Sequence, residues 1–268
     1  MTFPGVPHAR LAAADRHRLA ATFDDAADVY DRARPGFPAV ALDWILPAGA
    51  GEVLDLGAGT GKLTRSLVAR GLTVTAIDPS PNMLARLREH LPTIDSRLGS
   101  AEAIDLPDAS MDAVLVGSAF HWFDRPAADA EIARVLRPGG VAGLLWNRRD
   151  PASSSFNAFD AASVAASHSM GRAVEHLRPE RNSSVELDRH FFGPTERGDF
   201  EHSQELSIDG VLELISSRSY VIAMHDDDRR DLLATIRRRI EAEVPAGELI
   251  EVGYTTIALR AERAIPAG

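Results

Sequence analysis

Short apolar runs alternate with amphipathic stretches through the middle of the chain. The run Glu52–Leu56 is largely apolar and ends at a cluster of glycines, and Lys62–Arg70 then carries its apolar side chains at helical spacing. The same order returns in Thr73–Ile77, which is followed by a helical pattern through Met83 and Leu87. Strands and helices of this length in alternation predict parallel βαβ units, with helices on both faces of the sheet.

The pattern continues as far as Trp146 and predicts three further strands and one helix. The strands are expected at Arg97–Gly99, Asp112–Gly117 and Val141–Trp146. The helix is expected at Pro126–Leu136, with a stop at the Pro-Gly-Gly that follows.

The two ends of the chain carry different patterns. Residues 16–33 have a helical apolar face that ends at the turn Arg34-Pro35-Gly36, and a second helix is expected at 38–46. After Asn147, residues 150–195 are rich in Ser, Ala and Arg, which indicates helices and loops inserted over the core. The remaining elements are predicted as strands 198–208 and 249–262 and helices 209–218 and 226–244.

Together these elements predict the fold class. We expect an α/β, Rossmann-like, seven-stranded and mostly parallel sheet with helices on both faces, an N-terminal helix and a helical cap insertion.

Composition and charge exclude several classes of function. Of the 268 residues, 45% are hydrophobic and 25% charged, which is typical of a globular protein. The net charge of −10 repels a polyanion, so we expect no nucleic-acid partner. No apolar run is long enough to cross a bilayer, so we expect no membrane partner.

The residue types also limit the chemistry. Cysteine is absent, so a disulfide, a thiolate metal site and a cysteine nucleophile are excluded. No cluster of His and Asp has metal-ligand spacing, and we predict no metal. The first 18 residues lack the apolar core of a signal peptide, and a cytoplasmic location is the expectation.

The candidate chemistry begins at the glycine cluster, Asp55-Leu-Gly57-Ala-Gly59-Thr-Gly61. Glycines in a strand-to-helix turn let backbone N–H groups approach a ligand closely, although a tight turn without a ligand is the alternative. The dinucleotide fingerprint needs a third glycine where this chain has Lys62. That departure disfavours a nicotinamide-dependent dehydrogenase.

An acidic residue at the end of the second strand adds to this signal. Asp78 follows the glycines by about 20 residues, where a carboxylate can accept both hydroxyls of a ribose. The alternative is a helix cap, since Asp is a favoured cap residue. The pair of features indicates a ligand that contains adenosine.

Here the sequence resembles the class I S-adenosylmethionine-dependent methyltransferases. Val53–Gly61 is similar to their first motif and Ala76–Met83 to their second. The resemblance implies that the glycine loop faces the methionine part of S-adenosyl-L-methionine, that Asp78 holds the ribose, and that Met83 and Ser100–Glu102 contact the adenine. The predicted cofactor-binding residues are Tyr30, Arg34, Asp55, Gly57, Ala58, Gly59, Gly61, Asp78, Pro79, Met83, Ser100, Ala101, Glu102 and Ser118.

A narrower resemblance covers the outer parts of the chain. Residues 23–38, Ser118–Asp124, Ser217–Tyr220 and 254–263 are similar to a methyltransferase-11-like subgroup that includes trans-aconitate-type methyltransferases. This likeness favours an oxygen as the methyl acceptor. Arg34 is then expected to pair with the carboxylate of the cofactor, and a helix end with a solvated arginine is the alternative.

The predicted catalytic residues follow the fourth strand. His121 is a candidate for a base or a group that orients the substrate, and Trp122 for a wall of the substrate site. A histidine that only hydrogen-bonds a loop, and a tryptophan that only packs, are the alternatives. Arg148, Arg149 and Arg218 are candidates for holding a carboxylate on the substrate, and each alone is more often a surface residue.

The functional hypothesis is S-adenosylmethionine-dependent methylation of a small molecule, on a carboxylate or hydroxyl oxygen, with S-adenosyl-L-homocysteine as the product. N- or C-methylation, a different reaction of the same cofactor in a natural-product pathway, and a binding protein without turnover stay open. The expected organisation is an N-terminal segment 1–47 that closes over the cofactor, a cofactor-binding core 48–148, and a part 149–268 with the cap and the final strands. The oligomeric state stays open.

Overall fold

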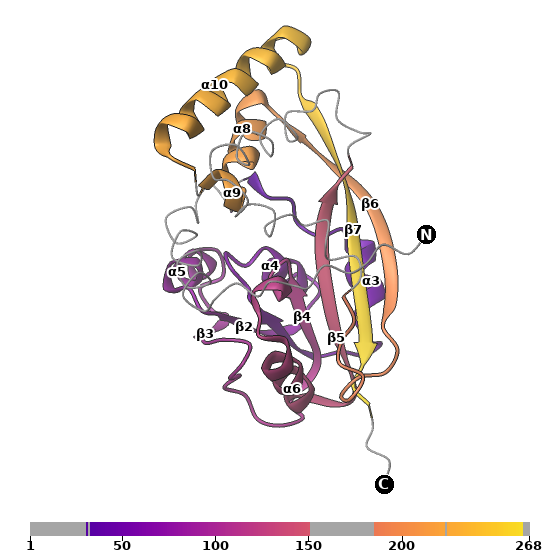
Figure 1. Ribbon diagram of the computed structural model, residues 1–268. Helices are drawn as coiled ribbons and strands as arrows, with labels where there is room; N and C mark the ends of the chain where they lie inside the picture. Colours follow the sequence, from indigo (N-terminus) through magenta and orange to yellow (C-terminus); the bar gives the residue numbers. More distant parts are fainter. Residues whose placement is uncertain (1–30, 32, 151–184, 223, 265–268) are drawn as a thin grey trace, which may run out of the picture.

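The computed structural model describes residues 31, 33–150, 185–222 and 224–264 (Figure 1). Most of the predicted helix 16–33, with Tyr30, and most of the predicted insertion 150–195 lie outside the described residues.

A single seven-stranded sheet forms the centre of the molecule, in the order β3-β2-β1-β4-β5-β7-β6. Its first five strands are all parallel to one another: β1 (Glu52–Leu56), β2 (Thr73–Asp78), β3 (Asp95–Leu98), β4 (Met111–Gly117) and β5 (Leu136–Arg149). β7 (Ile250–Glu262) runs antiparallel between β5 and β6 (Glu196–Leu206). The predicted seven-stranded, mostly parallel sheet is therefore confirmed.

Helices cover both faces of this sheet, as predicted (Figure 1). One face is covered by α3 (Ala39–Ile45) and α4 (Lys62–Val68), and the other by α6 (Arg125–Val135). The remaining described helices are α5 (Pro81–His90), the short η1 (Phe120–Trp122), α8 (Ile208–Ser216), α9 (Ser219–Ile222) and α10 (Asp226–Glu243).

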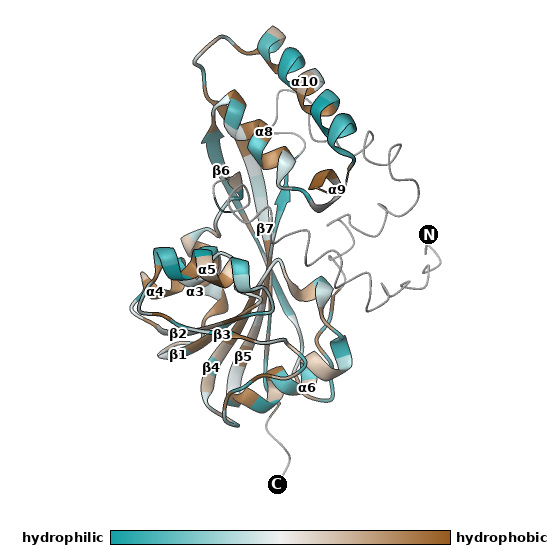
Figure 2. Cartoon of the chain, turned by 90° about the vertical axis from the view of Figure 1, so that its left-hand side faces the viewer, coloured by the Kyte–Doolittle hydropathy of each residue, from teal (hydrophilic) through white to brown (hydrophobic). Residues whose placement is uncertain are grey.

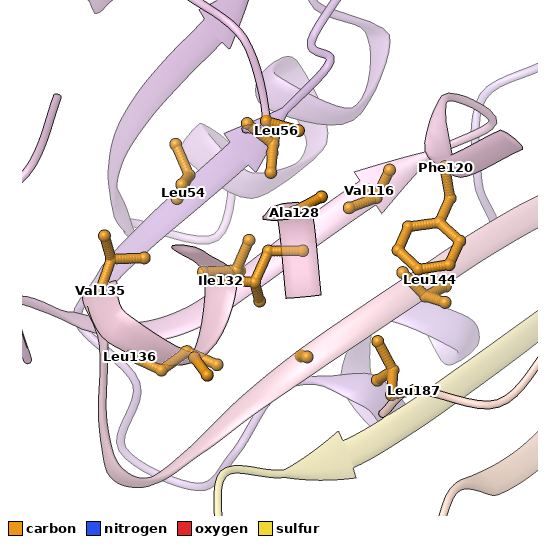
Figure 3. Packing of buried hydrophobic residues seen from close by; sticks show 14 of the residues in the cluster. Leu54, Leu56, Val116, Phe120, Ala128, Ile132, Val135, Leu136, Leu144 and Leu187 are labelled. Atoms are coloured by element: carbon orange, nitrogen blue, oxygen red, sulfur yellow. The ribbon is translucent and has the colours of Figure 1, made fainter. Parts of the chain in front are cut away.

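Side chains of β1 alternate between the hydrophobic clusters on the two faces of the sheet. Leu54 and Leu56 pack with Ile132 of α6 and with Phe120 (Figure 3), whereas Val53 belongs to the cluster under α3 and α4. Successive side chains of a strand point to opposite faces, so a strand that is covered on both sides is almost wholly apolar. This explains why β1 is apolar at Val53, Leu54 and Leu56, and why Asp55 between them is fully buried, whereas Glu52 at the start of the strand is half-buried.

A second hydrophobic cluster lies at the far end of β6 and β7. There α8, α9 and α10 pack on Ile250, Val252 and Tyr254, above the level of α4 and α5 (Figures 1 and 2). In α10 the buried residues Leu232, Ile236 and Ile240 recur every four positions, and the opposite face is polar (Figure 2).

The predicted boundaries differ from the structure mainly at β5. This strand begins at Leu136 and continues to Arg149, well beyond the predicted range of 141–146, and it contains the Pro-Gly-Gly that was expected to stop the preceding helix. The extension beyond Trp146 is explained by the partner strand, because β7 pairs with β5 from Val141 to Arg149, whereas at the start of β5 Leu136 pairs with Met111 of β4. That pairing is not visible in the local pattern.

The remaining predicted elements are found with ends shifted by a few residues at most. Among the described residues, no helix is both long and apolar enough to pass through a membrane.

Candidate functional site

The glycine cluster forms the turn between β1 and α4. Gly57, Gly59 and Gly61 have φ angles of +75°, +56° and +84°, a region that residues with a side chain rarely adopt. The backbone N–H groups of Gly57 and Ala58 donate to the carbonyl oxygen of Ile77, at 2.8 and 3.1 Å. The turn is thus attached to β2, close to the residue that carries the predicted ribose contact.

Two of these glycines have different steric surroundings. A Cβ atom on Gly57 would stand 2.5 Å from the Cβ of Ala119, so only glycine allows the loop after β4 to approach. Among the residues that the structure describes, none would lie within 4 Å of a Cβ on Gly59. The turn is therefore tightly packed on the side of Ala119 and open at Gly59, which is the form expected of a cradle for a ligand.

Asp78 lies at the end of β2 and faces this turn. Its Oδ2 accepts a hydrogen bond from the Gly59 N–H at 2.8 Å, and its Oδ1 accepts one from the Ser80 N–H at 2.9 Å. The N-cap of α5 is Ser80, whose Oγ accepts from the Met83 N–H at 3.1 Å. The alternative of Asp78 as the helix cap is therefore wrong, whereas its contact with a ribose stays a prediction.

Asp55 is fully buried beneath the same turn. Its Oδ2 accepts a 2.6 Å hydrogen bond from the hydroxyl of Thr64, while its Oδ1 is buried with no hydrogen-bond partner in the described structure. The pKa of this carboxyl is raised to about 7, mainly by burial and to a smaller extent by the nearby negative charge of Asp78. A cation at the open oxygen would lower that pKa again.

The predicted cofactor-binding residues that follow Asp78 in the chain differ in their exposure. Met83 and Ala101 are buried, Ser100 and Glu102 are half-buried, and Pro79 is exposed. Glu102 accepts a hydrogen bond from the Asp124 N–H at 2.8 Å, which ties this segment to the end of the loop after β4.

The loop after β4 carries the predicted catalytic residues. Ser118 has a φ of +58°, a strained conformation for a residue with a side chain, and its N–H donates to the carbonyl of Leu145 at 2.8 Å. His121 and Trp122 follow on η1, with ring centroids 4.7 Å apart. Backbone strain of this kind is concentrated at functional sites.

His121 combines solvent exposure with a surrounding of protein. Its surface is exposed, yet burial by neighbouring groups is the main reason that its pKa is lowered, to about 4, with the charge of Arg34 as the second reason. At neutral pH the imidazole is uncharged and has a nitrogen available to accept a proton.

Arg34 is half-buried and lies against Ser217, at the end of α8. Its Nε and Nη2 donate to the hydroxyl and the carbonyl oxygen of Ser217, both at 2.9 Å, across a separation of 183 residues. The alternative of a solvated arginine at a helix end is therefore wrong. Its pairing with a cofactor carboxylate stays a prediction.

Asp31 is a residue of the site that sequence reasoning missed. Its carboxylate accepts hydrogen bonds from Thr60 in the glycine turn at 2.9 Å and from Arg65 at 3.0 Å, and it lies 2.8 Å from Nε2 of His90. These bonds hold the segment that carries Arg34 against the cofactor end of the sheet. The sequence carries no signal for them, since the partners are 29 to 59 residues away.

The three candidate arginines for the substrate separate in the structure. Arg148 is exposed, and its charge adds to the hydrogen bond from Arg197 in lowering the pKa of Asp199. Arg149 and Arg218 are half-buried. The charge of each lowers the pKa of the buried Tyr254, against the larger effect of burial, which raises it. Tyr254 is a second residue to which sequence reasoning gave no role.

The residues at the turn fit S-adenosylmethionine on grounds of their own chemistry. An open left-handed glycine leaves room for the methionine part, and a buried carboxylate oxygen without a partner suits its ammonium group. Asp78 ends the neighbouring strand with an acceptor for hydroxyl groups, and Met83 and Ala101 offer an apolar wall. Among the described residues, no group of three or more His, Cys, Asp or Glu could hold a metal ion.

Comparisons with known proteins agree with this geometry. Residues 54–144 match the family model of a methyltransferase domain. The chain is 40% identical, over 92% of its length and 97% of the relative, to an uncharacterized methyltransferase of Mycobacterium tuberculosis. It is 44% identical, over 34% of its length and 36% of the relative, to a malonyl-[acyl-carrier protein] O-methyltransferase of Serratia marcescens.

A solved structure extends the similarity to the fold. A protein from Anaeromyxobacter dehalogenans, provisionally assigned as a type II methyltransferase, superimposes with a TM-score of 0.60 at 27% identity. The match covers 87% of this chain and 99% of that one.

Proposed function

We propose that this chain, which belongs to the class I S-adenosylmethionine-dependent methyltransferases, methylates an oxygen atom of a small molecule. The turn at Gly57–Gly61 is assigned to the methionine part of the cofactor, the Oδ1 of Asp55 to its ammonium group and Asp78 to its ribose. These roles are supported by the open side of Gly59 and by the unpartnered oxygen of Asp55.

The observation that carries the proposal is the position of His121 relative to the glycine turn. The loop after β4 touches the turn through Ala119 and Gly57, and His121 follows two residues later with an uncharged imidazole. A group at this place adjoins both the cofactor site and the carboxyl ends of β4 and β5, where ligands bind in open α/β sheets.

When bound, S-adenosylmethionine supplies a methyl group on a positively charged sulfur. As the acceptor oxygen forms its bond to the methyl carbon, the carbon–sulfur bond breaks and S-adenosylhomocysteine leaves. For a hydroxyl acceptor, His121 takes the proton of the hydroxyl. For a carboxylate acceptor there is no proton to remove, and His121 orients the substrate.

Oxygen as the acceptor has weaker support than methyl transfer itself. The Serratia relative is named an O-methyltransferase, but its match covers only about a third of either chain. The acceptor is therefore tested directly, by transfer of a labelled methyl group from S-adenosylmethionine to paired panels of alcohols, phenols, carboxylic acids and amines.

His121→Ala tests the role of the imidazole in the full chain. We expect kcat for a hydroxyl acceptor to fall by about 10²- to 10⁴-fold, with S-adenosylhomocysteine affinity unchanged. His190→Ala is the matched control, because His190 is exposed and outside the site. Since the pKa of His121 is lowered, kcat of the unaltered protein at saturating S-adenosylmethionine should persist at pH 5 and fall only as the pH approaches 4. Binding of the cofactor product with no transfer to any panel member would overturn the proposal.

A further inference from the structure

A row of polar side chains crosses three strands at one edge of the sheet. Arg149 of β5 is paired with Tyr254 of β7, which is paired with His202 of β6. Residues directly opposite each other on neighbouring strands point to the same face. The ring of Tyr254 stacks on that of His202, with centroids 5.3 Å apart, and its hydroxyl accepts a 2.9 Å hydrogen bond from Gln204.

The same register places Arg148 on the opposite face. It is paired with Thr255 and is exposed, and its charge lowers the pKa of Asp199 on β6. Two adjacent arginines of one strand therefore have different surroundings, since only Arg149 shares the face of Tyr254.

Positive charge converges on the hydroxyl of Tyr254. Burial raises the pKa of Tyr254, so the phenol keeps its proton at neutral pH, while the charge of Arg218, the hydrogen bond from Gln204 and the charges of Arg34 and Arg149 act in the opposite direction. Arg34 is held in place by its two hydrogen bonds to Ser217, the residue before Arg218. Arginines beside a neutral phenol offer several N–H donors and one O–H donor to a single acceptor group, the arrangement that recognises carboxylates and phosphates.

This cluster also adjoins the methyl-transfer site. The side-chain N–H of Gln204 that donates to Tyr254 also donates to the carbonyl oxygen of Ala33 at 3.5 Å, next to Arg34 in the chain. The charge of Arg34 is in turn the second cause, after burial, of the lowered pKa of His121 on the loop after β4. Arg149 ends β5, next to β4 in the sheet, and Tyr254 lies near the start of the antiparallel β7. All of these groups therefore share the edge of the sheet at which the acceptor must bind.

We propose that Arg149, Arg218 and the hydroxyl of Tyr254 form an oxyanion subsite for the substrate. The inference rests on the proposed function: the substrate is a small molecule with a carboxylate or a phosphate monoester, which this subsite holds while the acceptor oxygen faces His121. Arg148 has no part in it.

The test measures binding to the full chain saturated with S-adenosylhomocysteine. The probes are succinate, glutarate and phenylacetate, each compared with its neutral amide, and glycerol 3-phosphate compared with glycerol. We expect one class of anion to bind at least ten times more tightly than its uncharged counterpart. The carboxylate and phosphate arms distinguish the two sources of the oxyanion.

Four variants locate the site. Arg149→Gln and Arg218→Gln should each weaken binding of the preferred anion by about 10- to 100-fold, because each removes a charge-assisted bidentate contact. Arg148→Gln, the matched control from the opposite face, should change it less than twofold. Arg149→Lys should recover part of the loss, since it restores the charge without the planar geometry.

The outcomes separate this inference from the proposed function. Unchanged S-adenosylhomocysteine affinity in each variant shows that the fold and cofactor site are intact. Anions and neutral analogues that bind equally, no binding of either, or an equal loss in the Arg148 and Arg149 variants would overturn the subsite. Methyl transfer confined to uncharged acceptors would overturn the subsite while leaving the methyltransferase assignment in place.

Discussion

The two halves of the candidate site are built in different ways. The cofactor half consists of the turn Gly57–Gly61, Asp55 and Asp78, all within about 25 residues of one another and held by two adjacent parallel strands. The substrate half joins His121, Arg149, Arg218 and Tyr254, which come from four separate parts of the chain. One half is set by local sequence, the other by sheet register and by the packing of the cap.

The segment from Asp31 to Gly36 connects these halves. Asp31 is bonded to the glycine turn and to α4, Arg34 is bonded to Ser217 of the cap, and the carbonyl oxygen of Gly36 accepts a 2.8 Å hydrogen bond from the side chain of Asn147. The difference teaches that binding of the cofactor and choice of the substrate can vary separately. Variants of each half should accordingly have separable effects.

The largest effect is expected where the two halves touch. Gly57→Ala adds a Cβ at a positive φ and 2.5 Å from Ala119, so the free energy of unfolding should fall by about 2–4 kcal/mol. Chemical denaturation measures this fall. Gly139→Ala, at a φ of +77° with nothing within 4 Å, should cost only about 1 kcal/mol.

The double variant Gly57→Ala/Ala119→Gly identifies the contact responsible. It should be more stable than the sum of the two single changes predicts, by about 1 kcal/mol or more. Strict additivity would mean that the loop after β4 moves away from the turn at little cost, and the link between the halves would then be weaker than the structure indicates.

The next largest effect is a pH dependence of cofactor binding, which we expect from the cofactor half of the site. The pKa of Asp55 is raised to about 7 in the free protein, and the ammonium group of the ligand needs the charged carboxylate. Affinity for S-adenosylhomocysteine should therefore fall as the pH drops below 7, by at most about tenfold per unit. Calorimetric titrations between pH 5.5 and 7.5 measure the slope.

Asp55→Asn is the control for that slope, since it should bind more weakly and with little dependence on pH. The sign for stability is opposite. A raised pKa favours the protonated folded state, so the contribution of Asp55 to the stability of the free protein is complete below about pH 4 and is lost as the pH rises through 7. An Asp55→Asn protein whose thermal midpoint at pH 8 is far below that of the unaltered chain would contradict this account.

The smallest effect concerns the connecting segment. Asp31→Asn removes the charge that binds Arg65 and Thr60, and we expect a loss of about 2- to 10-fold in S-adenosylhomocysteine affinity. The hydrogen bonds from Arg65 and Thr60 lower the pKa of Asp31 against the effect of burial, so its carboxylate is charged at neutral pH. Ser217→Ala, which alters the other anchor of the segment, should change cofactor affinity less and substrate affinity more. A larger loss of cofactor affinity in Ser217→Ala than in Asp31→Asn would contradict the division of the site into two halves.

Sequence reasoning predicted the strand–turn–helix that carries the cofactor half for a physical reason, whereas the binding roles of its residues stay predictions. A strand, a glycine turn and a helix lie consecutively in the chain, and the acid at Asp78 ends the next strand, so pattern and spacing define their geometry. The order of the elements and the parallel core followed from the same alternation.

The parts that sequence reasoning missed depend on distant contacts. The extension of β5 beyond Trp146 is set by β7, more than 100 residues later, and the face of Arg149 depends on that register. Asp31, Ser217 and Tyr254 acquire their roles only through partners far along the chain. No local pattern distinguishes Arg148 from Arg149, although the structure places them on opposite faces.

The central claim is that the turn at Gly57–Gly61 and the carboxylate of Asp78 bind the methyl donor. It is tested most directly by calorimetry of S-adenosylhomocysteine with the full chain and with Asp78→Ala, using Asp95→Ala as a control on the exposed edge strand. We predict micromolar binding by the unaltered and control proteins and a loss of about 10- to 100-fold in the Asp78 variant. No heat with S-adenosylhomocysteine, or equal binding of NADH, would contradict it.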